Sequence, residues 1–440
     1  MAKISEKTMD FNSKVKTNFA GGDLTSDSGL LLYKEFDEKI GFSKTIRDCL
    51  DFDDDVEHRI HDNADVVIQR IYQNAAGYHA DSAANHLRKD TLFNTVFEKE
   101  QLASQPTMSR QNSISDKETM KQLQSAKSKL LYKIYRKEPP KEIICDLDST
   151  ASITYGKQYG SNYNKHYGHK CYHPLLLFDG KTGDALKGEL RAGNVYTSRQ
   201  VVRFIGPILK DYGKTFPETS FYLRADSGFA IPGLYRMCEE HDTDYTIRLK
   251  ANAKLYELAE PLEEKLCEPD SNKFKDSGVV YGEFSYQADS WEDPRRVAVK
   301  IEKSKYEIAL RYTFIVTNIL DKEPKELIDF YFKRSTMENF IKEAKNGFAI
   351  DRMSSTDFWS NACKLQQMLL AYNLNNWLRR LTFPESYKTD RIFTIRMKLI
   401  KIAARVVRTG RYLYFKLASS CPYKKLFWSV LVNIQNLEFT

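Results

Sequence analysis

The sequence of 440 residues predicts an α/β fold with a helical N-terminal region, a β-rich insertion and a basic helical C-terminus. From residue 141 to residue 253, apolar runs and amphipathic segments follow one another in the order strand, strand, strand, helix, strand, helix, strand. Such alternation is typical of a layered α/β structure. Three alternating β-rich runs then follow, and we expect them to form an insertion before the helical patterns resume.

Local signals set the boundaries of these regions. The first region is polar, with Ser and Asp N-cap candidates before apolar residues at helical spacing, and the prolines at 139 and 140 end it. The strands IICDLDST, HPLLLFD, ALKGEL, FYLRADS and DYTIRLK are short apolar runs bounded by turn residues. We expect the regions 1–140 (helical, N-terminal), 141–253 (core, first part), 254–320 (β-rich insertion), 321–400 (core, second part) and 401–440 (basic, C-terminal).

Composition excludes several classes of protein. Hydrophobic residues make up 42% of the chain and charged residues 29%, as in an ordinary globular protein. No apolar run approaches the roughly 18 residues that a membrane span needs, and the N-terminus has no apolar signal segment. The seven cysteines include no CxxC pair, so neither a disulfide framework nor a structural zinc site is expected.

Positive charge is concentrated near the C-terminus. The net charge is +8, and residues 379–425 carry thirteen Lys or Arg against two acids, interleaved with aromatic residues. This is the electrostatic pattern of a protein that binds a phosphate backbone, although a solvated basic helix over core aromatics gives the same pattern.

Three acids have contexts that suit chemistry. Asp148 ends an apolar strand in DLDST, Asp226 ends another in RADSG, and Glu338 lies in a helix. Carboxylates at strand ends can converge with a helical carboxylate, and hard oxygen ligands suit Mg²⁺. Two such ions can activate the attacking oxygen and stabilise the leaving oxygen in phosphoryl transfer. Any single acid can equally be a surface charge or a helix cap.

The residues around Glu338 strengthen this interpretation. Tyr331, Arg334, Glu338 and Lys345 stand at i, i+3, i+7 and i+14, which puts them on one narrow stripe of a continuous helix. Such a stripe would present a metal ligand, two cations and a phenol, which are groups that grip phosphates.

The spacing Y-x2-R-x3-E-x6-K in YFKRSTMENFIKEAK resembles the signature of bacterial DDE insertion-sequence transposases of the YREK type. DLDST and RADSG resemble the first and second acidic motifs of these enzymes. ASQPTMSR and ELRAGNVYTSRQ resemble segments of the insertion-sequence family numbered thirteen-eighty. The resemblance runs from about residue 15 to residue 420, and the order of strands and helices is similar to the RNase H-like catalytic core of that superfamily.

The resemblance implies a function. We expect a DDE transposase that uses Asp148, Asp226 and Glu338 to hold two Mg²⁺ ions, which Mn²⁺ can replace. The N-terminal region would bind the terminal inverted repeats, and metal-dependent hydrolysis would free 3′-OH ends that join target DNA. The expected partners are double-stranded DNA and a second copy of the chain in a homodimer. No association with a membrane is expected. The expected location is the bacterial cytoplasm, at the nucleoid when the protein is bound to DNA.

Further residues have weaker assignments. Asp146 lies two residues before Asp148, on the same face of the strand, and is a rival for the first acid or a support for it. We expect Tyr331, Arg334 and Lys345 to contact DNA, together with Trp291, Arg295 and Arg296 of the insertion. Trp291 would stack on a flipped base, or else pack on the strands of the insertion itself. The crowded His166, His169, Cys171 and His173 allow a soft-metal site, although a loop that contacts DNA fits better.

Two other functions fit part of the pattern. A catalytically silent, transposase-derived DNA-binding regulator would keep the DNA-binding parts, but the intact acids argue against it. A tyrosine recombinase would use Tyr331 as a nucleophile, but that chemistry needs a clustered set of Arg and His residues. Metal-dependent nicking of the repeat ends would exclude the silent regulator. Cleavage retained by Tyr331→Phe would exclude the tyrosine recombinase, which needs that phenol as its nucleophile.

Overall fold

The computed structural model describes residues 6–54, 59–266, 277–306 and 309–439. The chain divides into two compact units, and each is described by itself. Unit 1 comprises residues 1–134, 343–350 and 359–440, and unit 2 comprises residues 135–342 and 351–358. The chain passes from unit 2 back to unit 1 within the helix that starts at Ser335.

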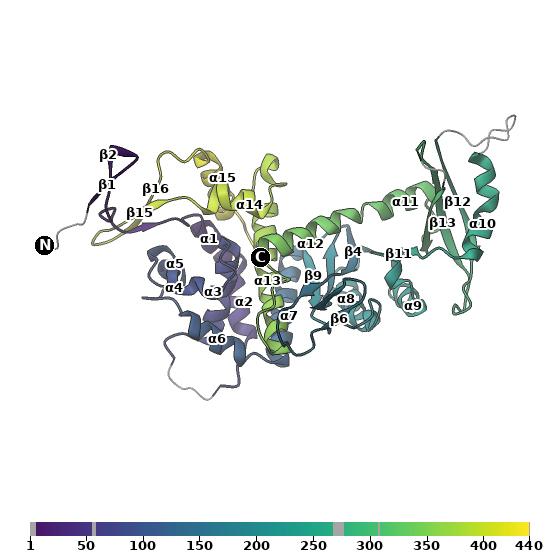
Figure 1. Cartoon of the computed structure of the whole chain (residues 1–440), viewed down its shortest axis with the longest axis horizontal. Helices are drawn as coiled ribbons and strands as arrows, with labels where there is room; N and C mark the ends of the chain where they lie inside the picture. Colours follow the sequence, from purple (N-terminus) through teal and green to yellow (C-terminus); the bar gives the residue numbers. More distant parts are fainter. Residues whose placement is uncertain (1–5, 55–58, 267–276, 307–308, 440) are drawn as a thin grey trace. The chain divides into compact units, whose positions relative to one another are not determined.

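Unit 2 is built on one large sheet (Figure 1). Its strands run in the order β12-β13-β14-β11-β10-β4-β8-β9. They are β4 (Glu142–Ser149), β8 (Leu175–Asp179), β9 (Ala185–Glu189), β10 (Ser220–Ala225), β11 (Thr243–Leu249), β12 (Gly278–Tyr286), β13 (Arg295–Lys303) and β14 (Arg311–Thr317). The helices of this unit are α8 (Val201–Thr215), α9 (Pro232–Glu240), α10 (Ala253–Glu263) and α11 (Pro324–Phe332), with the first half of α12 (Ser335–Phe348).

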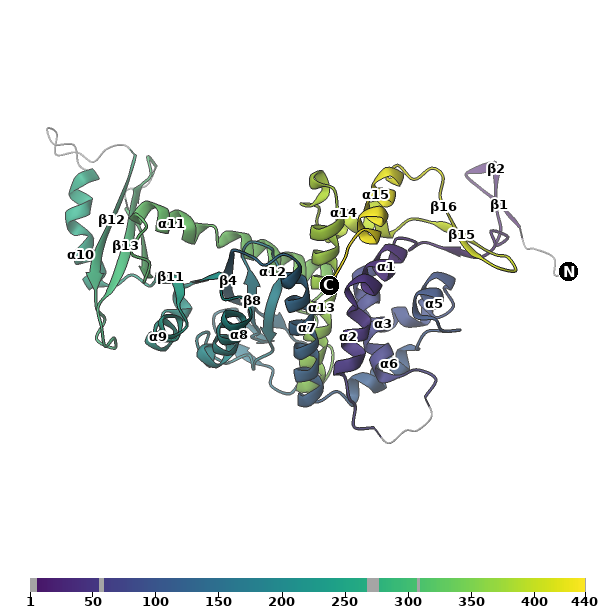
Figure 2. The same ribbon diagram turned by 180° about the vertical axis from the view of Figure 1, so that it is seen from behind.

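The centre of this sheet is parallel. β4, β10 and β11 run in the same direction, whereas β8 pairs antiparallel with β4 and β9 pairs antiparallel with β8. β8 is buried along its whole length, as is most of β4, because central strands are covered on both faces. α8 links β9 to β10, and it packs against α9, which links β10 to β11 (Figure 2). The strands and helices expected from residue 141 to residue 253 are present in the expected order, but three short strands that were not expected lie between the first two, from Ser152 to Tyr172.

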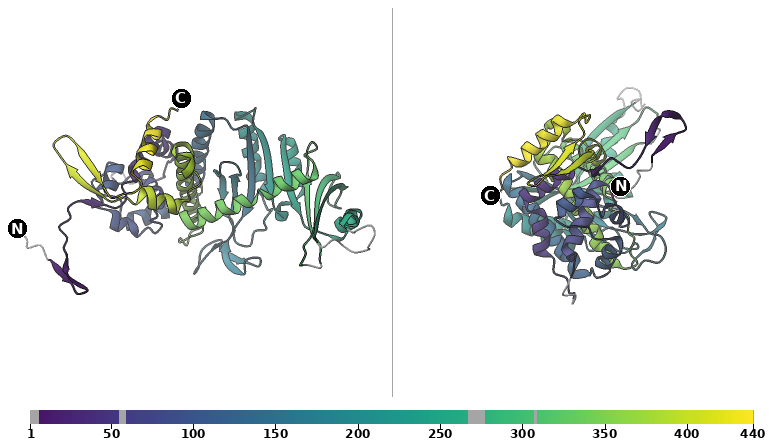
Figure 3. Two further views of the ribbon diagram at one scale, coloured as in Figure 1. Left: turned by 90° about the horizontal axis from the view of Figure 1, so that it is seen from above. Right: turned by 90° about the vertical axis from the view of Figure 1, so that its left-hand side faces the viewer.

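The residues of the expected insertion extend this same sheet. The segment starts with helix α10 and then forms β12, β13 and β14, which continue the sheet antiparallel from the edge of β11. α11 packs across β11 to β14 (Figure 3) through Leu327, Ile328 and Tyr331, which meet Ala298 and Ile315 in one apolar cluster. These strands are therefore an outer part of one eight-stranded sheet.

A small second sheet lies in the connection between β4 and β8. Its strands run in the order β5-β7-β6, with β5 at Ser152–Ile153, β6 at Asn162–Asn164 and β7 at His169–Tyr172. Both pairings are antiparallel. This connection brings polar and aromatic residues beside the end of β4, where Asp148 lies.

Unit 1 is mainly helical, as the sequence predicts for its N-terminal part. Its elements are β1 (Lys7–Met9), β2 (Asn12–Thr17), β3 (Leu24–Thr25), α1 (Leu30–Ile40), α2 (Phe42–Cys49), α3 (Asn63–Ala76), α4 (Ala83–Leu87), α5 (Thr91–Phe97), α6 (Gln105–Ser113), most of α7 (Lys117–Lys137), α13 (Phe358–Thr382), α14 (Ile392–Ile395), β15 (Ala404–Arg408), β16 (Leu413–Leu417) and α15 (Lys424–Gln435). α13 is buried on nearly all sides, which makes it the central helix of the unit. Arg70 of α3 donates to Gln367 of α13 over 3.0 Å.

The expectation of a wholly helical C-terminus is wrong for residues 404–417. β15 and β16 form an antiparallel hairpin, and β3 pairs with β15 to complete a three-stranded sheet (Figure 3). The physical reason is the alternation of residues in ARVVR and LYFKL, which is the period of a strand. The high density of positive charge obscured this alternation. No helix in the described part of the chain is long and apolar enough to cross a membrane.

Candidate active site

Two of the three predicted acids lie together because their strands are neighbours. The registered pairs of β4 and β10 end with Arg224 opposite Asp146 and Ala225 opposite Leu147. Asp148 and Asp226 each follow one residue later. Since β4 and β10 are parallel neighbours, both carboxylates stand at the carboxyl ends of their strands, on the same side of the sheet's strand ends.

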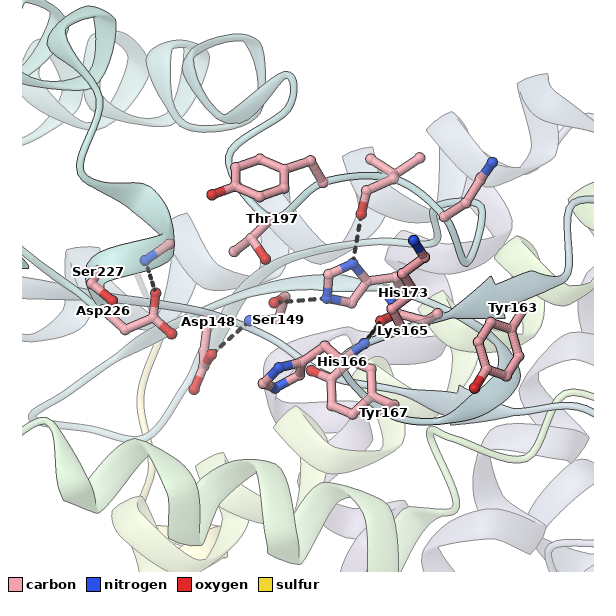
Figure 4. A pocket seen from close by; sticks show the side chains of 15 residues that line it. Asp148, Ser149, Tyr163, Lys165, His166, Tyr167, His173, Thr197, Asp226 and Ser227 are labelled. Atoms are coloured by element: carbon pink, nitrogen blue, oxygen red, sulfur yellow. Dashed lines mark hydrogen bonds between the residues drawn. The ribbon is translucent and has the colours of Figure 1, made fainter. Parts of the chain in front are cut away.

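Asp148 and Asp226 face one cavity of about 700 Å³ (Figure 4). The connection between β4 and β8 forms one wall, and the loop before α8 forms another. The other lining residues are Ser149, Tyr163, Asn164, Lys165, His166, Tyr167, His173, Asn194, Val195, Tyr196, Thr197, Ser227 and Gly228. The lining contains hydroxyl, amide, imidazole and phenol groups, so the cavity is suited to a polar ligand.

A tight turn directly after β10 sets the position of Asp226. Its Oδ1 accepts a hydrogen bond from the backbone N–H of Gly228 over 2.8 Å, which caps the short turn Ser227–Phe229. A Cβ at position 228 would lie 3.0 Å from Cγ2 of Thr197 and 3.1 Å from the Asp226 carboxylate. Glycine therefore lets the loop that carries Thr197 approach the acid closely.

An arginine of the predicted helix stripe pairs directly with Asp148. Nη2 of Arg334 lies 3.0 Å from Oδ2 of Asp148. Burial raises the pKa of Asp148 to about 6, while Arg334 opposes that rise and the charges of Asp226 and Glu338 add to it. The three predicted acids therefore act on one another electrostatically, with the negative charge at Asp148 partly balanced by one guanidinium.

Glu338 is exposed on α12 and does not line the cavity. In the described ranges, no three Asp, Glu, His or Cys side chains stand close enough together to hold one metal ion. This also removes support for the soft-metal site at His166, His169, Cys171 and His173. The hard oxygen donors of Asp148 and Asp226 suit a divalent cation of the Mg²⁺ type, and Glu338 adds negative potential at the same place.

The predicted single stripe is interrupted between two helices. α11 ends at Phe332 and α12 begins at Ser335, and the turn between them places Arg334. The N–H groups of Arg334 and Met337 bond to carbonyls three residues earlier, which is tighter than the four-residue α-helical pattern. This tightening rotates the residues that follow it relative to Tyr331, so the angles of one ideal helix do not apply.

The residues of the stripe consequently have different surroundings. Tyr331 is buried, 5% exposed, in the apolar cluster beneath α11, and burial raises the pKa of its phenol. Lys345 lies on the part of α12 that belongs to unit 1. Arg334 contacts one of the cavity acids directly, through its ion pair with Asp148. The proposed DNA contacts of Tyr331 and Lys345 stay predictions.

Asp146 is a structural neighbour of the site. Both of its oxygens accept hydrogen bonds from Arg224, at 2.6 and 2.7 Å, and the same guanidinium donates to the carbonyl of Phe330 over 2.8 Å. Burial raises the pKa of Asp146 to about 6 despite this partner. Asp146 therefore ties β4 to β10 and to the end of α11, while Asp148 faces the cavity.

The three other residues predicted to contact DNA make contacts with other side chains of unit 2. Trp291 is 8% exposed and packs edge-on against Tyr235 and Tyr286, with ring centroids 5.3 Å away in both cases. Arg295 pairs with Glu239, and Arg296 pairs with Glu283. Stacking of Trp291 on a DNA base stays a prediction, and it requires the indole ring to leave this aromatic cluster.

His173 contacts Ser149, the residue that follows Asp148, and the sequence pattern does not predict this contact. Nε2 of His173 lies 2.9 Å from the hydroxyl of Ser149, and Nδ1 lies 2.9 Å from the carbonyl of Val195 (Figure 4). The carbonyl needs a donor, so Nδ1 carries the proton and Nε2 accepts from Ser149. Burial lowers the pKa of His173, which favours this neutral form. The crowding of histidines from His166 to His173 is the one feature of the sequence that points to this segment. Which histidine contacts which residue depends on the fold.

The chain matches known proteins at the level of the family. A search of the curated proteins gives no match. Among solved structures, the piggyBac transposase in a synaptic complex with hairpin DNA is similar, with 13% sequence identity and a TM-score of 0.44. The similarity covers 94% of this chain and 82% of that one, and so remote a likeness says nothing about what this chain binds. The family described as transposase DDE domain group 1 matches residues 7–439, so the protein belongs to this family of DDE transposases.

Proposed function

We propose that this transposase binds the terminal inverted repeats of an insertion sequence, cuts DNA by metal-dependent hydrolysis and joins the freed 3′-OH ends to target DNA. The observation that carries the proposal is the shared cavity of Asp148 and Asp226, at the ends of two adjacent parallel strands. The charge of Glu338 also acts on Asp148. Three acids far apart in the sequence thus influence one small region.

The strand order supports an RNase H-like core. Within the large sheet, the five strands in the order β9-β8-β4-β10-β11 have the first strand, β4, in the middle, and β8 alone among the five runs antiparallel to the other four. In this arrangement the first acid lies on the first strand and the second follows the fourth, as Asp148 and Asp226 do. We infer that β12 to β14 are an addition to this core.

DDE transposases generally use divalent metal ions. We infer that Asp148 and Asp226 hold one ion and that Asp148 and Glu338 hold a second, with Mg²⁺ as the natural metal and Mn²⁺ as a substitute. Bound there, the metals would activate the attacking oxygen and stabilise the leaving oxygen of a phosphodiester. Arg334 counters the charge that accumulates at Asp148. Its Nε is buried without a hydrogen-bond partner in the described residues, which suits an arriving phosphate.

A second cavity supports DNA binding by the N-terminal region. This cavity of about 630 Å³ lies in unit 1, and its lining combines cationic and hydroxyl side chains. Arg88 and Arg110 are exposed, and neither takes part in the ion pairs of the described residues. The lining residues are Arg59, Ile60, His61, Arg88, Ser104, Thr107, Arg110, Ser113 and Ile114. Guanidinium and hydroxyl groups are common partners of DNA phosphates.

Labelled end DNA incubated with purified protein and Mg²⁺ tests the proposal. The wild type should nick the DNA at the end of the element, while Asp226→Ala should bind the end and leave it uncut. Glu292→Gln is a matched control, because Glu292 is an exposed acid of the same unit, with 73% of its side chain accessible. Cleavage by Asp226→Ala near the wild-type rate would contradict the assignment. Binding without cleavage by the wild type would support the alternative, a catalytically silent regulator.

Joining two DNA ends favours a homodimer in the complex with DNA. Light scattering of the protein with and without end DNA tests this part of the proposal. A complex that contains one protein chain and two DNA ends would contradict it.

A further inference from the structure

The connection between β4 and β8 has an unusual composition. From Ser149 to Phe178 it contains no Asp or Glu, and tyrosines stand at positions 155, 159, 163, 167 and 172. It also contains Lys157, Lys165 and Lys170. This connection forms the small sheet β5-β7-β6 beside Asp148. A cationic, tyrosine-rich segment next to a catalytic cavity is suited to an anionic ligand with flat faces.

Several of these rings are exposed to solvent. Tyr155 is 83% exposed, Tyr159 is 79% and Tyr163 is 62%. Tyr196, from the loop before α8, is 70% exposed. Tyr163 and Tyr196 both line the cavity that holds Asp148 and Asp226. Large rings left in water at the wall of one cavity indicate a surface that a ligand covers.

Close packing holds the two walls together. A Cβ at Gly193 would lie 2.0 Å from the carbonyl oxygen of Cys171 and 2.4 Å from that of Asn162, so only glycine lets this loop approach the small sheet. The side-chain amide of Asn164 donates to the carbonyl of Gly193 over 2.8 Å. The loop that carries Tyr196 is therefore fixed against the strand that carries Tyr163, and little freedom is lost when a ligand binds.

Cations stand beside the rings. Lys170 is the registered partner of Tyr163 across β6 and β7, and both side chains are exposed. Lys165 lines the cavity (Figure 4). Neither lysine joins an ion pair within the part of the chain that the structure describes. Lysine beside an exposed ring is the combination that tracks a nucleic-acid backbone while its bases stack.

We propose that Tyr163 and Tyr196 bind unpaired nucleotides of DNA by stacking on the bases, while Lys165 and Lys170 contact the phosphates. A paired base has its faces covered by its neighbours, so the rings favour bases that have left the duplex. The inference rests on the proposed function, because distortion of a DNA end for cutting supplies such nucleotides next to Asp148 and Asp226. It assigns the β4–β8 connection a role that is separate from metal binding.

The test measures the affinity of the full chain for a labelled single strand of about 12 thymidines, a length within the usual range of binding-site sizes. Tyr163→Ala and Tyr196→Ala should each weaken binding by about ten-fold, whereas the Phe variants, which keep the ring, should stay within about two-fold. Tyr306→Ala is the matched control, because Tyr306 is 91% exposed in the same unit but does not line the cavity. Thermal unfolding checks that each variant folds.

A duplex of the same length completes the test. Selective loss of single-strand affinity in the Ala variants supports the proposal. Equal loss for single strand and duplex, or wild-type affinity in both Ala variants, overturns it. Cleavage by the wild type together with unchanged single-strand binding in the Ala variants refutes only the stacking site. Selective loss of binding together with a wild type that never cuts refutes only the proposed function.

Discussion

Arg334 lies in the turn between α11 and α12, and its Nη2 is 3.0 Å from Oδ2 of Asp148 on β4. This pair connects the Arg of the YREK-like spacing to the first acid of the candidate site. A guanidinium at this distance lowers the pKa of the carboxyl group, against the burial that raises that pKa to about 6. The pair therefore sets the pH range in which Asp148 is negatively charged.

Arg334→Gln should shift the pH dependence of cleavage. Without the guanidinium, the pKa of Asp148 rises above about 6, so the carboxylate form is lost at a higher pH. The cleavage rate should fall by about ten-fold or more at pH 6 and by less at pH 8. Arg334→Lys keeps the charge and should keep the acidic limb close to its wild-type position. Equal losses at both pH values would show that Arg334 does not control Asp148.

The pair of Asp146 and Arg224 should act on stability. Asp146→Leu should lower the free energy of unfolding by about 3 kcal/mol, because it leaves a buried guanidinium without its charge partner. Arg224→Met should lower the free energy of unfolding by a similar amount, because it leaves the buried Asp146 carboxylate without its partner. The double variant should recover most of the lost stability. Urea unfolding of all four proteins measures the coupling. Additive losses would contradict the role of Asp146 as a structural partner of Arg224.

The pH dependence of stability follows from the same two acids. The pKa values of Asp146 and Asp148 are raised from 3.8 to about 6 in the folded chain, which therefore binds more protons than the unfolded chain between these values. Their contribution to the free energy of unfolding should fall as the pH rises from about 4 to about 6. Urea unfolding of the wild type and Asp148→Asn across this range isolates the share of Asp148. A wild-type slope retained in the variant would contradict the raised pKa of Asp148.

Metal binding should be visible without any DNA. Saturating Mg²⁺ at about 100 times its Kd should stabilise the wild type by roughly 2.7 kcal/mol, and EDTA should remove the effect. Asp148→Asn and Asp226→Asn should lose most of this shift in thermal unfolding, while Glu292→Gln should keep it. If both Asn variants retain the full shift, the metals bind elsewhere.

Trp291 should behave as a core residue of the outer sheet. Trp291→Ala should cost about 3 kcal/mol of stability, because the ring fills the space between Tyr235 and Tyr286. Trp291→Phe should keep most of the packing and close to wild-type cleavage. If Trp291→Phe instead folds normally but cuts slowly, the indole contacts DNA.

The sequence predicted the centre of the fold because its signals are local. The runs IICDLDST and FYLRADS are short, apolar and bounded by turns, so the strands that carry Asp148 and Asp226 were recognisable. The hairpin at residues 404–417 was missed because positive charge dominated its pattern. At the break before Ser335 the backbone hydrogen bonds join residues three apart, which helical periodicity does not record.

The partners of individual side chains could not be predicted in the same way. The bidentate contact of Asp146 with Arg224 depends on the parallel register of β4 and β10. Likewise, His173 reaches Ser149 and Val195 only after two loops fold over the end of β4. The sequence motifs singled out Asp148 and Asp226, which line the cavity, but they did not distinguish residues that support the strands from residues that face the cavity.

The parallel register of β4 and β10 has a consequence for the history of such chains. Asp148 and Asp226 are adjacent through a ladder of backbone hydrogen bonds, so the length of the chain that links them does not set their separation. Loops in that link can lengthen or shorten at a small entropic cost. Divergent relatives are then better recognised by which strand ends carry the two acids than by the number of residues between them.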